Sequence, residues 1–199
     1  MQLWKIIRRL KHIKSRLVTD IWYRSQFQKV GCKTKIEQPI TYSSPDCIEI
    51  GNNVYIGPYC RIEAFPGYGG VATSPRLKIG NSVCIQHAVH LWCASSLILE
   101  DFVLIASGCM STDENHGMTA DIGPYVSQAL ITKPTILKKG VWLGENVCVT
   151  AGSSIGEWSI VGSNSVVSGN IPAYSIAVGS PAKVIKAYCF ETKQWIKCV

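Results

Sequence analysis

One histidine of this sequence is well placed to act as a base. His116 lies in the stretch MSTDENHGM, residues 110–118, shortly after Asp113 and Glu114 and directly before a glycine. An imidazole has an unperturbed pKa of about 6.5, so near neutral pH it is uncharged and can take a proton from a hydroxyl group. Its second ring nitrogen then needs an acceptor, which Asp113, Glu114 or a backbone carbonyl could provide. The competing interpretation is an ordinary loop histidine.

The other three histidines carry weaker signals. His90 lies in HAVHLW and is the second candidate for an active-site contact, at the corner just before Leu91. Trp92 follows it, and its ring could stack on the apolar face of a sugar or simply pack in the structure. We expect His87 to be structural or a surface group, and His12 carries no functional signal.

A six-residue repeat underlies the elements that must position these side chains. Its longest run consists of Leu137, Leu143, Val149, Ile155, Val161 and Val167, with glycine at 144, 156 and 162. The same period occurs in 50–62, 79–91 and 99–111, which makes fifteen hexads in four registers. Six is neither a helical nor a hairpin period, so the pattern predicts a solenoid in which three short strands close a coil of about 18 residues. The sequence therefore predicts an all-β solenoid of about five coils, with residues 30–36 as an irregular first step.

Three interruptions break this repeat. Residues 63–76, EAFPGYGGVATSPR, are rich in Gly and Pro and predict a loop. Two extra residues between Leu91 and Leu99 predict a small bulge. The longest break, 112–136, holds His116 near its start, and a break of this length in a compact repeat protein is usually functional.

The N-terminal segment carries the charge of the whole chain. Residues 1–30 hold eight Lys or Arg and one Asp, a net +7, whereas the other 169 residues hold 12 basic and 12 acidic side chains. Apolar residues recur there at spacings of three and four and predict an amphipathic helix: Leu3, Ile7, Leu10, Ile13, Leu17 and Ile21. One interpretation is that its apolar face packs on the domain or on a partner subunit. The other is that the helix lies on an anionic membrane surface.

The hydropathy, the N-terminal sequence and the cysteine count restrict the class of protein further. No apolar run approaches the roughly 18 residues of a membrane span, and the basic N-terminus has neither the apolar region nor the cleavage site of a secretory signal. Nine cysteines with no C-x-x-C pair predict reduced thiols in a cytoplasmic protein, several of them at positions where small apolar residues would pack. We expect three regions: a helical segment 1–30, a β-helix domain 31–171, and residues 172–199, a turn followed by a short C-terminal helix that caps the coil.

Residues 140–186 resemble the hexapeptide-repeat acyltransferases. The shared pattern runs from GVWLGENV to the exit IPAYSIAVGSPAKVIK, and the likeness continues upstream through IQHAVHLW and MSTDENHG, covering roughly 45–197. Within this family the sequence looks most like sugar O-acetyltransferases of O-antigen, lipopolysaccharide and capsule biosynthesis. The resemblance implies a left-handed parallel β-helix and a homotrimer whose active sites lie between subunits. It also implies acetyl-CoA as co-substrate, no metal and no nucleic-acid partner.

The same resemblance assigns roles to individual residues. It makes His116 the general base that takes a proton from the acceptor hydroxyl. The residues expected to contact a sugar or glycolipid acceptor are His90, Trp92, Asp113 and Asn115. The residues expected to contact the cofactor are Trp142 beside the pantetheine arm, Gly144, Ser163 and Ser168 along it, and Lys183 and Lys186 near the phosphates. For the two lysines a solvated surface is the plain alternative, and Trp142 could pack at a subunit interface.

Several functions remain open at this stage. The leading hypothesis is transfer of acetyl to a sugar hydroxyl, in the cytoplasm or at the inner membrane face. N-acetylation of a nucleotide-linked amino sugar, or O-acetylation of an antibiotic or other xenobiotic, would use much the same site. A zinc enzyme of the γ-carbonic anhydrase type would need three histidines across an interface, which His87, His90 and His116 supply only superficially. A non-catalytic β-helix scaffold is the fourth alternative.

Overall fold

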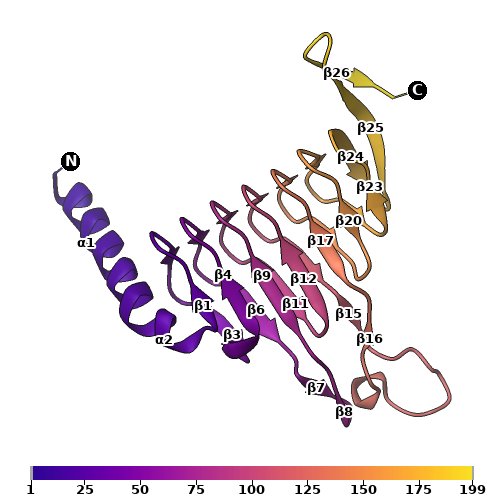
Figure 1. The fold of residues 1–199 in the computed structure, drawn as a ribbon, viewed down its shortest axis with the longest axis horizontal. Helices are drawn as coiled ribbons and strands as arrows, with labels where there is room; N and C mark the ends of the chain where they lie inside the picture. The colour runs from indigo at the N-terminus through magenta and orange to yellow at the C-terminus, as the bar shows by residue number, and fades with distance from the viewer. Residues whose placement is uncertain (1, 199) are drawn as a thin grey trace.

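The six-residue period forms a three-sided parallel β-helix. The computed structural model describes residues 2–198, and of these it leaves the side chains of residues 2–4, 6, 8, 9, 11 and 12, His12 among them, undescribed. Each coil contributes one short strand to each of three parallel sheets, here called A, B and C (Figure 1). Sheet C has six strands, so six coils are complete where about five are predicted, and two further strands begin a seventh. The left hand of the coil stays a prediction.

Each of the three sheets forms one side of the coil, and its strands within the coil are short and parallel. Sheet A contains β1 (Lys29–Val30), β4 (Ile48–Ile50), β9 (Arg76–Ile79), β12 (Ser96–Leu99), β17 (Thr135–Leu137), β20 (Ser154–Ile155) and β23 (Asn170–Ile171). Sheet B begins with β2 (Lys35–Ile36), β5 (Tyr55–Ile56), β10 (Cys84–Ile85), β13 (Leu104–Ile105), β18 (Trp142–Leu143), β21 (Ile160–Val161) and β24 (Ser175–Gly179). Sheet C contains β3 (Thr41–Ser43), β6 (Arg61–Ala64), β11 (His90–Cys93), β14 (Met110–Thr112), β19 (Cys148–Val149) and β22 (Val166–Val167).

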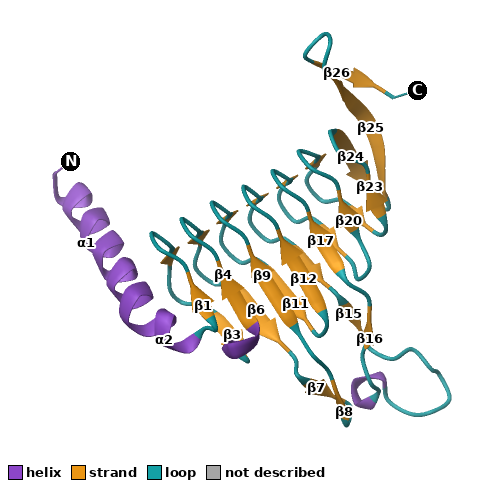
Figure 2. Ribbon diagram, viewed as in Figure 1, coloured by secondary structure: helices purple, strands orange, loops and turns teal. Residues whose placement is uncertain are grey.

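Two hairpins and the helices lie outside this coil (Figure 2). The hairpins are β7 (Gly67–Tyr68) with β8 (Val71–Ala72), and β15 (Glu114–Asn115) with β16 (Ile131–Thr132). Helix α1 (Gln2–Val18) continues into a π-helical turn, Thr19–Tyr23, and the short α2 (Arg24–Gln26). Two 3₁₀ turns, Pro45–Cys47 and Tyr125–Ser127, complete the elements. The amphipathic N-terminal helix is therefore present as predicted.

The C-terminal segment differs from the prediction. Residues expected to form a capping helix form β25 (Ala182–Cys189) and β26 (Gln194–Lys197), both antiparallel additions to sheet B. The last parallel strand, β24, leaves an edge of unpaired N–H and C=O groups, and an antiparallel strand satisfies them. Val184, Ile185 and Tyr188 are residue types that favour strands, so the predicted helix was wrong. The coil also begins at Lys29 and continues past residue 171 through β24.

The aliphatic residues of the repeat fill the core. Residues that occupy the same position in successive coils pair in register, so that Ile50, Ile79 and Leu99 form one column inside sheet A. All the repeat positions named from the sequence are buried, Ser111 included. Cys60, Cys93 and Cys109 are buried too, and burial raises the pKa of each thiol, to about 11, 12 and 11 respectively. All nine cysteines are free, which agrees with the prediction of reduced thiols.

Glycines at the corner between sheets A and B let successive coils approach closely. A Cβ on Gly51 would lie 2.4 Å from the carbonyl oxygen of Gly80, and a Cβ on Gly31 would lie 2.4 Å from the backbone of Gly51. The next residues form a polar column, in which Asn52 Oδ1 accepts from the N–H of Cys32 and Asn81 Oδ1 accepts from the N–H of Asn52. This column satisfies backbone N–H groups that the corner leaves without a strand partner.

The close approach predicts a specific instability. Gly51→Ala should lower the free energy of unfolding by roughly 1–3 kcal/mol, because its Cβ can only be accommodated by moving backbone. The matched control is Gly67→Ala, whose Cβ would meet its nearest atom at 3.5 Å. Urea unfolding followed by circular dichroism compares the two, and an equal loss in both variants would contradict the packing argument.

Candidate functional site

Two excursions leave the coil at the same corner. The hairpin β7–β8 follows β6, and the long loop with β15 and β16 follows β14; both therefore start where sheet C turns into sheet A. They project together from one side of the β-helix (Figure 2). Their backbones touch, because a Cβ on Gly69 would lie 2.7 Å from the carbonyl carbon of Gln128. The loop predicted at 63–76 and the break predicted at 112–136 thus form one structure.

Asp113 anchors the base of the long loop. Its carboxylate is fully buried and accepts hydrogen bonds from the backbone N–H groups of Ala94 and Ser95, each at 2.8 Å, and from the Cys93 thiol at 3.4 Å. Ala94 and Ser95 lie in the bulge predicted between Leu91 and Leu99. The carbonyl of Asp113 accepts from the N–H of Lys133 at 2.8 Å, which closes the loop on itself. Asp113 therefore holds the loop in place and does not face an acceptor, contrary to the role expected for it.

A second brace shapes the loop beyond His116. The buried amide of Gln128 accepts from the N–H of Thr119 at 3.1 Å and donates to the carbonyls of Thr119 at 2.8 Å and Gly123 at 3.1 Å. Gly117 is packed so closely that a Cβ would lie 2.6 Å from the Gln128 side chain. Together with the anchor at Asp113, these contacts hold the chain on both sides of His116.

His116 faces a pocket between the two excursions. The pocket has a volume of about 260 Å³ and is lined by Arg61, Glu63, Phe65, Tyr68, Trp92, Glu114, His116 and Leu130. The Tyr68 and His116 rings meet edge to face, with centroids 5.2 Å apart. Burial raises the pKa of the Glu114 carboxyl, an effect that the neighbouring His116 opposes. Of the acceptors considered for the second ring nitrogen, Glu114 is thus the carboxylate that shares the pocket with His116.

The floor of the pocket is a polar network on the outer face of sheet C. Glu63 accepts a hydrogen bond from the Trp92 indole N–H at 3.0 Å and pairs with the Arg61 guanidinium at 2.9 Å. The guanidinium also lies over the Trp92 ring, 5.5 Å from its centroid. His90 packs beside Trp92 at 5.5 Å, and burial, followed by the charge of Arg61, lowers its pKa. An imidazole in this position is neutral near pH 7.

The structure separates the predicted acceptor residues into three groups. His116 and Trp92 line the pocket, and His90 lies directly against Trp92. Asn115 is exposed and is not among the lining residues, whereas Asp113 is buried beneath the loop. His87 is exposed, as expected, and its Nδ1 shares a hydrogen bond with the Ser107 hydroxyl.

Sequence reasoning missed five lining residues: Arg61, Glu63, Phe65, Tyr68 and Leu130. The repeat could have placed Arg61 and Glu63, because the two neighbours of an inward-facing strand residue such as Ile62 face outward. In the register of the coils Glu63 then pairs with Trp92. Tyr68 and Leu130 lie in irregular excursions, where no periodicity places a side chain.

The residues predicted to contact the cofactor lie elsewhere on the coil. Trp142, Ile176 and Lys186 occupy one row across the outer face of sheet B, linked through β21. Gly144 packs against Ser163, since a Cβ there would lie 2.7 Å from the Ser163 nitrogen, and the Ser163 hydroxyl accepts from the N–H of Glu145 at 3.1 Å. Ser168 is exposed at the next corner, after β22.

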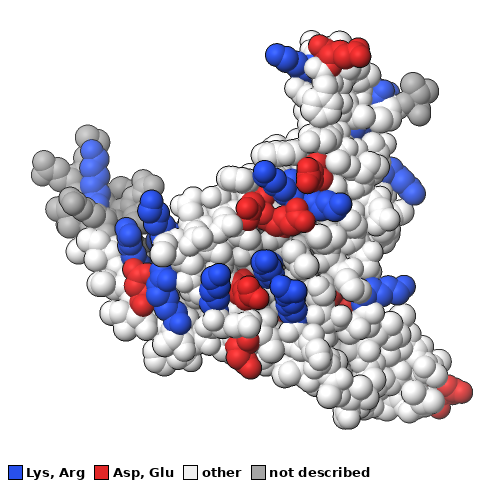
Figure 3. All heavy atoms as spheres, viewed as in Figure 1, with Lys and Arg blue, Asp and Glu red and all other residues white. Residues whose placement is uncertain are grey.

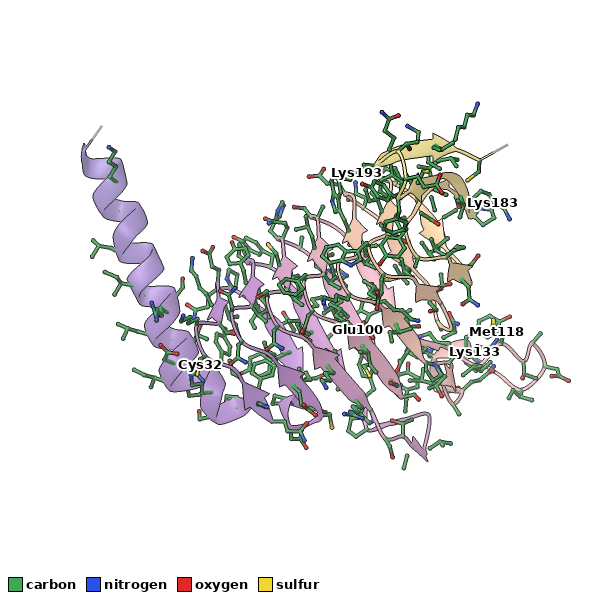
Figure 4. All side chains as sticks on the ribbon, turned by 45° about the horizontal axis from the view of Figure 1, so that its top comes forward. Cys32, Glu100, Met118, Lys133, Lys183 and Lys193 are labelled. Atoms are coloured by element: carbon green, nitrogen blue, oxygen red, sulfur yellow. The ribbon has the colours of Figure 1, made fainter. Side chains whose placement is uncertain are left out.

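The two lysines are exposed on β25. Figure 4 separates Lys183, on the C-terminal strands, from Met118 and Lys133 on the projecting loop. An aromatic groove of about 350 Å³ adjoins the row, lined by Gly140, Trp142, Trp158, Ile160, Tyr174, Tyr188, Phe190 and Trp195. Within a single chain, Trp142 and the two lysines therefore lie on sheet B, whereas the pocket with His116 lies against sheet C and the excursions that follow it.

The residues that the structure describes, 2–198, contain no candidate metal centre and no candidate membrane span. No group of three or more His, Cys, Asp or Glu side chains there is placed to hold a metal ion. Over the same residues, no helix is long and apolar enough to cross a membrane.

Comparison with known proteins identifies the class of protein to which this β-helix belongs. The chain is 33% identical over 195 residues to the putative lipopolysaccharide biosynthesis O-acetyl transferase WbbJ of Escherichia coli K12, an alignment that covers 94% of this chain and 92% of that protein. A mutant of AntD, an N-acyltransferase from Bacillus cereus in complex with dTDP-4-amino-4,6-dideoxyglucose and coenzyme A, superposes with a TM-score of 0.73 and 25% identity, covering 87% of this chain and 91% of that one. The hexapeptide-repeat acetyltransferase VCA0836 of Vibrio cholerae, complexed with acetyl coenzyme A, shares the fold, with a TM-score of 0.60, 20% identity and coverage of 90% and 86%. No family model matches the sequence.

These similarities decide the family. The chain belongs to the hexapeptide-repeat acetyltransferases. The prediction of an acetyltransferase that uses acetyl-CoA is thereby confirmed at the level of the family.

The anchor at the base of the loop can be tested by a single atom exchange. Asp113→Asn should lower the free energy of unfolding by about 2–3 kcal/mol, because an amide has one acceptor oxygen where Ala94 and Ser95 use two. Asp101→Asn is the control, since Asp101 accepts from Asn81 through one oxygen only. Thermal unfolding of both variants measures the loss of stability. Equal stability of the Asp113 variant and the wild type would contradict the proposed role of Asp113 as the anchor of the loop.

The contact between Tyr68 and His116 has its own readout. Tyr68→Ala should shift the His116 imidazole proton resonances, since they lose the ring current of Tyr68, and should lower turnover by about tenfold through loss of orientation. The matched control is Tyr125→Ala, at an exposed tyrosine of the long loop that holds His116 but outside the pocket lining. If both variants behave like the wild type, Tyr68 does not position the histidine.

Proposed function

We propose that this protein transfers acetyl from acetyl-CoA to a hydroxyl of a sugar in surface-polysaccharide biosynthesis, with His116 as general base. One observation carries the proposal: His116 faces a pocket that also holds Trp92, a ring suited to the apolar face of a sugar, and polar groups suited to its hydroxyls. The relationship to WbbJ supports a sugar of O-antigen, lipopolysaccharide or capsule as acceptor.

The proposed chemistry follows from these residues. A sugar hydroxyl is a weak nucleophile toward a thioester until its proton is removed. His116 takes that proton as the hydroxyl oxygen bonds to the acetyl carbonyl carbon, and the carbon–sulfur bond then breaks. The proton passes from His116 to the departing sulfur, so the products are an acetyl ester and free CoA thiol. Glu114 shares the pocket and is the carboxylate placed to stabilise the transient imidazolium.

The cofactor residues suit an extended, phosphate-bearing molecule. The row from Trp142 to Lys186 offers an apolar stretch that ends in a cation, and Lys183 lies on the same strand. Lysine contacts phosphate as a point charge, without the bidentate geometry of arginine. Acetyl-CoA bound there would supply the activated acetyl group.

The proposed assembly is a homotrimer with its sites between subunits. Within one chain, Trp142 lies on sheet B, while His116 lies at the corner between sheets C and A. A neighbouring subunit could bring its sheet B against this corner, so that one site draws residues from two chains. This arrangement supports the assembly that the resemblance implies.

An amine acceptor is the second candidate. AntD, which superposes on most of the chain, is an N-acyltransferase in complex with a dTDP-linked amino sugar. Glu63 and Glu114 place two carboxylates in the pocket, where an ammonium group could bind. An antibiotic or other xenobiotic hydroxyl is a further variant of the same reaction.

One assay tests the proposal and separates these acceptors. Release of free CoA thiol is measured with sugars, nucleotide-linked amino sugars, lipid-linked glycans and acetylatable antibiotics. We expect turnover with a glycan hydroxyl and a loss of about 10²–10⁴-fold in His116→Ala, the usual contribution of a general base. His87→Ala, at an exposed histidine outside the pocket, should behave like the wild type.

Two outcomes would overturn parts of this proposal. Equal turnover in His116→Ala and wild type would remove His116 from the mechanism. Turnover confined to amino sugars or antibiotics would replace the acceptor while leaving the base in place.

A further inference from the structure

The apolar face of α1 points into solvent. Leu10, Ile13 and Leu17 recur in α1 at spacings of three and four and therefore share one face, and Ile21, in the π-helical turn that follows, continues the same spacing. Their exposed fractions are 59%, 49%, 54% and 72%. Figure 1 shows the helix projecting away from the coil over most of its length. A contiguous apolar stripe of this kind on a folded protein marks an interaction surface.

The opposite face is the one that holds α1 to the coil. Thr19 is buried, and its hydroxyl donates to the Ser15 carbonyl at 2.7 Å and accepts from the N–H of Ile36 at 2.9 Å. Val18 packs against the core beside it. Just beyond, Arg24 donates to the carbonyls of Val30 at 2.6 Å and Gly31 at 3.0 Å. The helix is therefore fixed at its C-terminal end and cannot rotate its apolar stripe inward without breaking these bonds.

Cations accompany the stripe. Lys5, Lys14 and Arg16 are exposed on the described part of the helix. Asp20, the one acid of residues 1–30, pairs with Arg24 at 3.0 Å and lies 4.0 Å from the Arg16 guanidinium. On the face that Figure 3 shows, the charged side chains of the helix are mostly Lys and Arg, whereas positive and negative side chains are mixed over the coils. The surface thus offers an apolar stripe together with nearly the entire net charge of the protein.

The combination of an apolar stripe with positive charge indicates which partner binds this surface. A second copy of the chain offers a β-helix of zero net charge, 12 basic against 12 acidic residues beyond residue 30, which does not complement a net charge of +7. An anionic bilayer surface complements both features, because acyl chains accept the apolar side chains and lipid headgroups attract the cations. Trp22, 54% exposed at the end of the helix, is a residue type that favours the interface between lipid and water.

We propose that α1 lies on an anionic lipid bilayer and holds the enzyme at its surface. The stripe Leu10–Ile13–Leu17–Ile21 enters the boundary between headgroups and acyl chains, with Lys5, Lys14 and Arg16 among the headgroups. This placement does not depend on the identity of the acetyl acceptor. It would concentrate the enzyme at the surface where lipid-linked glycans are found.

The test is vesicle cosedimentation of the full-length protein. Vesicles of phosphatidylcholine alone are compared with vesicles containing phosphatidylglycerol, each at low and high salt. We expect binding to the anionic vesicles, weakened by salt because the ions screen the headgroup charge. Leu17→Glu with Ile21→Glu should reduce binding to the level seen with neutral vesicles. Lys5→Glu with Lys14→Glu should weaken it by about tenfold or more.

A matched control separates this effect from a general change of charge. Ile122→Glu with Val126→Glu introduces the same two charges at positions that are 67% and 69% exposed on the long loop, and this variant should bind vesicles like the wild type. Because glutamate forms helices well, circular dichroism should be unchanged in the helix variants. The measurement needs no turnover, so its failure is distinct from failure of the proposed acetyl transfer.

Sedimentation equilibrium without lipid tests the alternative, in which a second copy of the chain covers the apolar stripe. The proposal expects the same assembly mass for the wild type and for the variant with Leu17→Glu and Ile21→Glu. A wild type that ignores anionic vesicles would overturn the proposal. Dissociation of the assembly in that variant would assign the stripe to a subunit interface instead.

Discussion

The rest of this structure depends on hydrogen bonding between successive coils. The N–H of Gly51 bonds to the carbonyl of Ile79, and that of Arg61 bonds to Val89, so each coil depends on its neighbours in the stack for its backbone hydrogen bonds. A coil that shifted by one residue would turn its aliphatic side chains outward, which couples register to the buried core. Extra residues can therefore leave the coil only at corners, where no ladder is interrupted. Both long excursions do so, at the same corner.

One buried charge joins the irregular parts of the chain. An unpaired carboxylate in the core would be costly, and Asp113 is tolerated because two backbone amides and a thiol donate to it. Those amides belong to the bulge after β11, while the carbonyl of Asp113 closes the long loop. The bulge, the loop and the position of His116 are thus one connected feature. The site is built on the rigid coil, although its histidine lies in a loop.

The molecule also separates its net positive charge, which lies in residues 1–30, from the candidate site around His116. The coil is neutral overall and fills its interior with aliphatic side chains, and within this chain the apolar stripe of α1 stays exposed. Thr19 and Arg24 attach the helix through its other face. The amphipathic pattern alone allowed two orientations of this helix. The attachment leaves the one in which the stripe is available to a partner.

The sequence by itself determined the repeat, the core and the place of the candidate base. A period of six has one structural solution for stacked parallel strands, and the residues named from it are the buried ones, because register makes each coil repeat the inward positions of the last. The N-terminal helix followed equally from its 3.6-residue period. The C-terminal segment did not: it was predicted as a helix, although Val184, Ile185 and Tyr188 favour strands, and its pairing with the open edge of sheet B makes it a strand.

Tertiary structure alone decided what surrounds His116. Tyr68 lies 48 residues before it in the chain and reaches it because both excursions start at one corner, a relation that no local pattern encodes. Asp113 looked like a partner for the histidine because it is near in sequence, yet a strand followed by a turn directs it beneath the loop, toward Ala94. Periodicity specifies positions within a coil. The contacts between segments that depart from it are set by where those segments leave the coil and by which buried polar groups they must satisfy.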